Sequence, residues 1–341
     1  MQLLEKLGIR LPIVQAPMAG ASTTELAIAV SSAGGLGSIA CALLTRDEIR
    51  KELEFFRSKS SAPVNLNFFC HQDLPETMVQ KAKWQQRLAS YYEELSLDPA
   101  DVIASARRAP FDEDHCRLIE ELKPSVVSFH FGLPNADLVE RVKNTGAVIL
   151  SSATTIDEAL WLEDKGCDVI IAQGAEAGGH RAMFLENNVS NQPGTINLLE
   201  GILSRIHLPV IAAGGIADAT GVEEAMAKGA QAVQVGTAYL FCREANVSPL
   251  YLKGLQSNRE TAITNVFTGK PARAIVNRFV EEVGPISESA PVFPFASGLV
   301  APLRRASEKA QSFDFMQMWS GTKRIPHSMD AGSLTRALCR E

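Results

Sequence analysis

Two glycine-containing loops, one strand–helix unit apart, are the first feature of this sequence that indicates a chemistry. Gly214-Gly215 follows the apolar run PVIAA, and Gly236-Thr237 follows the run AVQV. Glycines at the carboxyl ends of parallel strands let backbone N–H groups approach a phosphate without interference from a Cβ atom. We therefore predict that residues 209–239 hold the phosphate of a cofactor.

His130 is the candidate for acid–base chemistry. It directly follows the apolar run SVVSF, and no carboxylate pair stands at the ends of the other expected strands. An imidazole titrates near neutral pH and can take a proton from a weak carbon acid, a contribution of about 10²–10⁴-fold in rate. We predict that His130 is a catalytic base; the alternative is a histidine that is only packed in the core.

The remaining candidates are amides, a thioether and a second histidine. Gln173 and Gln234 end two apolar runs, where each either contacts a ring system or is a satisfied strand-end amide. Met18 either fills the core or lies against such a ring. His180 follows a glycine pair and is either an exposed loop residue or a ligand contact.

These residues require a scaffold that brings strand ends together. Short apolar runs rich in β-branched residues alternate with helical segments, which is the pattern of a parallel α/β protein. Eight such strands are expected, at 11–15, 36–40, 63–69, 126–130, 147–151, 168–173, 209–213 and 232–235. The fold class is therefore α/β, a (β/α)₈ TIM barrel, whose catalytic residues lie at the carboxyl ends of the strands.

The expected site follows from these strand ends. Apart from His130, the strand-end residues predicted to contact a phosphorylated cofactor are Ala16, Pro17, Met18, Asn67, Gln173, Gly178, Gly179, Gly214, Gly215, Gln234, Val235, Gly236 and Thr237.

The alternation breaks in two places. Residues 71–114 are charge-rich and mostly helical, and residues 240–341 read as helical or irregular with several prolines. We predict a cofactor-binding barrel from 1–70 and 115–243, a smaller cap domain from 71–114 and 244–322, and a C-terminal helix in 323–341 that packs on the barrel.

Composition limits the function classes. The net charge of −6 and the pI near 5.7 argue against nucleic-acid and anionic-membrane surfaces. No run has the pattern of a signal peptide or reaches spanning length, so we expect a cytoplasmic protein. The six cysteines form no CxxC pair and the six histidines no HxxxH pair, so we expect free thiols and no metal site.

Six ordered motifs resemble those of the nitronate monooxygenases, from about residue 10 to residue 280. They are PIVQAPMAG, VNLNFFCH, VSFHFGLP, QGAEAGGHR, PVIAAGGIAD and QVGTAYLFCREA. The resemblance implies an FMN-dependent TIM-barrel enzyme, a monomer or homodimer, that oxidises alkyl nitronates such as propionate 3-nitronate with O₂. The products would be a carbonyl compound and nitrite.

The resemblance also implies roles for matching residues. His130 matches the family histidine that deprotonates neutral nitroalkanes, and Met18 would lie under or beside the flavin ring. One departure is Trp319-Ser320-Gly321-Thr322, where relatives tend to carry Gly-Gln. FMN contacts are implied for Asn67, Gln173, Gly178, Gly215 and Gln234 to Thr237.

Two other functions fit the same residues. One is an FMN-dependent NAD(P)H:quinone or enoyl reductase on the same kind of barrel. The other is a flavin- or phosphate-binding barrel without catalysis.

Overall fold

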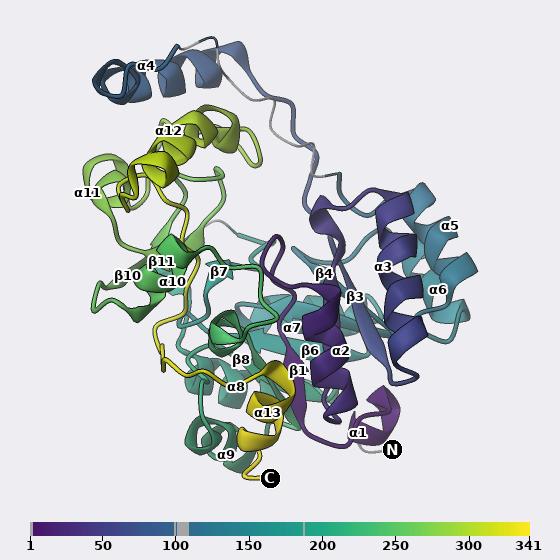
Figure 1. The fold of residues 1–341 in the computed structure, drawn as a ribbon. Coiled ribbons are helices and arrows are strands. Elements are labelled where there is room, and N and C mark those ends of the chain that lie inside the picture. The colour runs from purple at the N-terminus through teal and green to yellow at the C-terminus, as the bar shows by residue number, and fades with distance from the viewer. Residues whose placement is uncertain (1–2, 99, 101–108, 187) are drawn as a thin grey trace.

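The computed structural model describes residues 3–98, 100, 109–186 and 188–341, and its centre is a parallel barrel (Figure 1). Eight strands pair in the order β1-β9-β8-β6-β5-β4-β3-β2, and a parallel bridge between Val14 and Leu36 joins the two ends of that sheet. The predicted TIM barrel is confirmed. The strands are β1 (Ile13–Gln15), β2 (Gly37–Ala40), β3 (Val64–Phe69), β4 (Val126–His130), β5 (Val148–Ala153), β6 (Val169–Gln173), β8 (Val210–Ala213) and β9 (Ala232–Val235).

Helices cover the outside of the barrel because each turns one apolar face to the strands. Local signals place their ends: Thr45 accepts from the backbone N–H of Glu48, and the Glu48 side chain accepts in return, a complete capping box. The helices of the barrel are α1 (Leu3–Leu7), α2 (Thr24–Ser32), α3 (Arg46–Lys59), α5 (Glu113–Leu122), α6 (Ala136–Asn144), α7 (Ile156–Asp164), α8 (Thr195–Leu203) and α9 (Ala219–Ala227).

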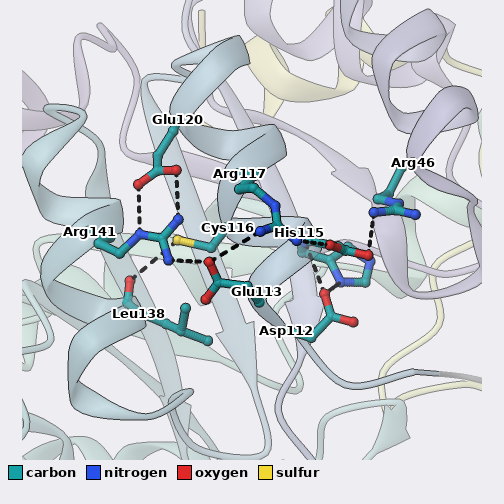
Figure 2. Close-up of polar contacts among 10 residues, drawn as sticks. Arg46, Asp112, Glu113, His115, Cys116, Arg117, Glu120, Leu138 and Arg141 are labelled. Carbon is teal, nitrogen blue, oxygen red and sulfur yellow. Dashed lines mark hydrogen bonds and ion pairs between the residues drawn. The ribbon is translucent and has the colours of Figure 1, made fainter.

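Partly exposed salt bridges connect α5 to α6 on the outer surface (Figure 2). Arg141 donates to Glu120 from Nε and Nη2, both at 2.7 Å, and to Glu113 at 2.6 Å. Exposed ion pairs contribute little to stability and are screened by salt. The buried residues beneath, such as Ile119 and Val142, are therefore the main attachment of these helices.

A second layer lies over one end of the barrel, at the top of Figure 1. It contains α4 (Met78–Glu94), α10 (Pro249–Gln256), α11 (Arg278–Val283) and α12 (Ala296–Ala310). It also contains a three-stranded antiparallel sheet, in which β11 (Ala272–Ile275) lies between β10 (Thr261–Thr264) and β7 (Gly179–His180).

The expectation of only helical or irregular structure after residue 239 was wrong, because β10 and β11 lie there. Both strands have four residues, too few for a clear alternation of apolar and polar positions. β7 pairs with β11 and comes from about ninety positions earlier in the chain, so that pairing left no local signal.

The apolar interior is divided between the barrel and this second layer. Trp84 and Leu88 of α4 pack with Phe267, Phe279 and Leu299 in a cluster separate from the barrel core. We refer to this set, which also includes Phe315, as the cap cluster. It joins segments on both sides of residues 115–243, as a cap domain would require, and we keep the domain division as our proposal.

The C-terminal helix α13 (Ala331–Ala337) lies beside α2 (Figure 1). Leu334 and Leu338 are buried in the barrel core, and the Thr335 hydroxyl lies 2.8 Å from the Tyr239 hydroxyl. Among the described residues, no helix is both long and apolar enough to cross a membrane.

Candidate active site

A cavity of about 720 Å³ opens at the carboxyl ends of the barrel strands, within the size range of ligand sites. Every predicted site residue lines it except Val235, which the structure buries in the barrel core. Val235 follows Gln234 on β9, and alternate residues of a strand face opposite sides. The predicted residues that share the cavity are Ala16, Pro17, Met18, Asn67, His130, Gln173, Gly178, Gly179, Gly214, Gly215, Gln234, Gly236 and Thr237.

Glycines shape one side of this cavity. Gly214 and Gly215 have φ values of 121° and 68°, in the region that side chains rarely adopt. A Cβ on Gly178 would lie 2.5 Å from the backbone nitrogen of Gly321, which no real contact allows. The glycines are therefore required by the backbone geometry, and they leave main-chain N–H groups accessible at β8 and β9.

The segment Trp319-Ser320-Gly321-Thr322 closes the glycine side of the cavity. The Gly321 N–H donates to the Thr237 hydroxyl at 2.9 Å, and the Thr322 N–H donates to the Glu176 carbonyl at 3.0 Å. Trp319 and Gly321 line the cavity. The segment that lacks the Gly-Gln of relatives thus still belongs to the site.

The side-chain oxygen of Gln234 is a hydrogen-bond acceptor suited to a ligand in the cavity. Gln234 Oε1 is buried, and no described residue donates a hydrogen bond to it. A buried acceptor without a partner costs about 1–3 kcal/mol, so it calls for a donor. Together with the glycine loops, this acceptor fits a phosphorylated cofactor with N–H or O–H groups on its ring system or side chain.

His130 ends β4 and is held by a backbone carbonyl. Its Nε2 lies 3.1 Å from the carbonyl oxygen of His180. A carbonyl can only accept, so Nε2 carries the proton of the neutral ring and Nδ1 keeps the lone pair. The pKa of His130 is lowered from 6.5 to about 4, mainly by burial; the hydrogen bond to the His180 carbonyl raises it in part, and the charges of Lys270 and Arg181 lower it. The imidazole is therefore neutral at physiological pH.

The amide of Gln173 makes one hydrogen bond within the protein from each of its two polar atoms. Its Nε2 donates to the same His180 carbonyl at 3.0 Å, and its Oε1 accepts from the Ala182 N–H at 2.9 Å. Gln173 thus lines the cavity while its hydrogen bonds fix the 180–182 backbone. Its predicted contact with the cofactor stays a prediction.

His180 is half-buried in the cavity wall and is not an exposed loop residue, while its contact with a ligand stays a prediction. It belongs to β7, opposite Ala272 of β11, and its ring centroid lies 5.4 Å from Phe293 and 5.3 Å from Trp319. Its Nε2 lies 2.9 Å from the Thr268 hydroxyl. The cavity therefore contains two imidazoles from different elements.

Charge in and around the cavity favours anions. Glu308 is the single carboxylate among the described lining residues, against the cations Arg304 and Lys323. Behind the wall, Arg181 is fully buried and donates to the Gln173 and Gly174 carbonyls at 2.6 Å each. No described carboxylate lies within ion-pair distance of Arg181. Among the described residues, no group of three His, Cys, Asp or Glu side chains could hold a metal ion.

Sequence reasoning missed the residues that the second layer contributes to the lining. They come from α10, α12 and the 313–323 segment, where no strand end marks them. These residues include Tyr251, Ser297, Gly298, Val300, Arg304, Met316 and Trp319.

Comparison with known proteins gives consistent results. The chain matches the nitronate monooxygenase family over residues 1–341. It is 37% identical to a nitronate monooxygenase of Paraburkholderia phytofirmans (99% of this chain, 94% of the relative) and 36% identical to one of Pseudomonas aeruginosa (98% and 97%).

Solved structures are similar as well. A nitroalkane oxidase from Streptomyces ansochromogenes superposes with a TM-score of 0.87 at 34% identity, covering 98% of this chain and 96% of that one. FabK from Thermotoga maritima superposes with a TM-score of 0.74 at 26% identity, covering 98% and 94%.

Proposed function

The chain belongs to the nitronate monooxygenase family, and from this premise we propose that it is FMN-dependent and oxidises alkyl nitronates with O₂. The products would be a carbonyl compound and nitrite, and propionate 3-nitronate is the substrate with which to test this. The observation that carries the proposal is a single cavity that combines glycine loops, two imidazoles and an excess of cations.

FMN fits the barrel side of the cavity. The N–H groups around Gly214, Gly215 and Gly236, with the Thr237 hydroxyl, would hold its phosphate. The unpartnered Gln234 Oε1 would accept a hydrogen bond from the cofactor. When bound, FMN supplies electron acceptance from the nitronate and reaction with O₂.

The chain itself binds the anion and restricts water. A nitronate carries a negative charge, which the cations in and behind the lining attract. Phe69, Phe293 and Trp319 form part of the aromatic surface around the two histidines. Polar interactions with the substrate are stronger there because water is partly excluded.

His130 would act as the base when the substrate is a neutral nitroalkane. Its Nδ1 has the lone pair, because Nε2 donates to the His180 carbonyl. With a pKa of about 4 it is available at neutral pH but weakly basic, since a general base works best with a pKa near the working pH. We therefore expect nitronates, which need no proton removed, to react faster than nitroalkanes.

The proposal is tested by identifying the cofactor and the products. The protein's cofactor is released by heat and identified, and nitrite and O₂ uptake are measured with propionate 3-nitronate. FMN together with nitrite formation would support the proposal. Rapid anaerobic reduction by NADH without any reaction with the nitronate would instead identify a reductase.

The role of His130 is tested by His130→Asn, which keeps a donor for the His180 carbonyl. We expect kcat/KM for nitroethane to fall about 10²-fold or more, and kcat/KM for ethyl nitronate to change by less than about threefold. His180→Asn is the matched variant because it removes the other imidazole of the cavity. Equal losses on both substrates would make His130 a binding or structural residue. A selective loss in His180→Asn alone would move the base to His180.

A further inference from the structure

Arg304 has hydrogen-bonding capacity that the protein does not use. It lies on α12 and lines the cavity, and its Nε is buried with no hydrogen-bond partner among the described residues. The nearest carboxylate is that of Glu308, one helical turn on, with Oε1 at 3.8 Å from Nε. That distance exceeds the 2.7–3.2 Å range of an N–H···O hydrogen bond.

The other cation of the lining differs in this respect. Lys323 Nζ lies 2.8 Å from Asp218 Oδ2, an ion pair of ordinary hydrogen-bond length. Asp218 is itself fixed, because its side chain caps α9 by accepting from the Gly221 N–H at 2.9 Å. Lys323 is thus already paired at hydrogen-bond distance, whereas Arg304 makes a longer ion pair with Glu308 and keeps a donor for a ligand.

The second layer holds Arg304 in a defined place. Leu299, Val300 and Leu303 of α12 are buried in the cap cluster. The Trp84 Nε1–H donates to the Ala296 carbonyl at 3.3 Å, and the Tyr92 hydroxyl donates to the Leu299 carbonyl at 2.6 Å. The Arg304 side chain is 42% exposed, so a small ligand can reach it from the cavity mouth.

We propose that Arg304 is the residue that binds the carboxylate of a carboxylated nitronate such as propionate 3-nitronate. A guanidinium is planar and offers paired N–H donors, which match the two oxygens of a carboxylate. The barrel supplies the glycine loops and the cap supplies Arg304, so the reacting carbon and the remote carboxylate would contact different parts of the protein. Binding of such a remote group positions the reacting end. The inference rests on the proposed function.

The test compares two nitronates of equal chain length on the flavin-loaded enzyme. One is propionate 3-nitronate and the other is propyl-1-nitronate, which lacks the carboxylate. For Arg304→Met we expect kcat/KM to fall about 30- to 100-fold with the first and less than about threefold with the second. Arg304→Lys should lie between, because an ammonium keeps the charge but not the bidentate geometry. The matched control is Arg305→Met, since Arg305 is the exposed neighbour on the same helix and does not line the cavity.

Other results would overturn the inference. Equal loss on both nitronates would mean that Arg304 shapes the cavity, and no loss on either would mean that Glu308 occupies it. Loss of flavin in Arg304→Met would assign Arg304 to the cofactor phosphate.

A binding measurement separates this inference from the proposed function. Succinate should raise the melting temperature of the wild type and of Arg305→Met but not of Arg304→Met, because a ligand stabilises the state that binds it. A wild type that oxidises neither nitronate contradicts the proposed function, while the succinate shift still decides on Arg304. Equal succinate shifts in all three proteins would overturn the carboxylate site.

Discussion

At the scale of residues, the partner of His130 determines its chemistry. The imidazole donates to the His180 carbonyl, which also accepts from Gln173. A carbonyl is neutral and stabilises a cationic ring less than a carboxylate would, while burial and Lys270 disfavour that charge. The site thus holds an imidazole that stays neutral, which suits the proposed nitronate substrate because a nitronate needs no strong base.

This environment predicts how stability depends on pH. The folded-state pKa of His130 is about 4 and its ordinary value is 6.5. Between these values the unfolded chain binds a proton that the folded chain does not, so stability falls as the pH drops from about 6.5 to about 4. The contribution of His130 is about 1–3 kcal/mol. Urea unfolding between pH 7 and pH 4 should show that loss in the wild type and less of it in His130→Asn. The control variant is His207→Asn, because His207 is exposed. Identical pH dependence in wild type and His130→Asn would contradict the prediction.

At the scale of elements, the sequence predicted the barrel strands and left out the small sheet of the second layer. Most barrel strands have a compact apolar run that ends in a glycine or polar residue, so both the type and the end of the strand are local signals. In the β7–β11–β10 sheet, β10 and β11 are short strands close together in the sequence, and only β7 pairs from a distant segment. The barrel residues of the cavity could therefore be predicted one by one.

The residues from the other layer could not be predicted in this way. Arg304 and Tyr251 reach the cavity only because α12 and α10 fold back over the barrel. Their sequence neighbourhoods resemble those of any amphipathic helix. Val235 shows the opposite error, because its position beside Gln234 was right while its side chain faces away.

At the scale of elements, the loop after β8 can be tested by substituting its glycine. Gly215 has a φ of 68°, and a Cβ there would lie 3.2 Å from the Glu176 Cβ. In Gly215→Val the loop must shift, so we expect the dissociation constant of FMN to rise about tenfold or more, as measured by equilibrium dialysis. Gly146→Val is the control, because Gly146 has a φ of 88° with open space around its Cβ and lies outside the cavity lining. It should lose stability from the same backbone strain and keep its flavin. Unchanged FMN affinity in Gly215→Val would place the phosphate elsewhere.

At the scale of the whole molecule, two apolar cores meet at one cavity. The barrel core fixes the glycine loops and His130, while the cap cluster fixes α12 and with it Arg304. In Figure 1 helices α1 and α13 lie on the side of the barrel away from the second layer. Cofactor binding and substrate binding should therefore depend on different cores.

Weakening the cap cluster should impair substrate binding and leave cofactor binding intact. Trp84 is fully buried between α4 and α12, and its loss in Trp84→Ala should cost about 3–5 kcal/mol because a large cavity remains. Since α12 carries Arg304, which we propose to bind the substrate, and the barrel carries the glycine loops, we expect KM for propionate 3-nitronate to rise about tenfold at nearly full FMN content. Trp161→Ala is the control, because Trp161 packs against Phe184 on the barrel and does not line the cavity. It should leave KM unchanged. If Trp84→Ala lost FMN and substrate affinity together in one unfolding transition, the two cores would behave as one cooperative unit, contrary to the proposed division into barrel and cap.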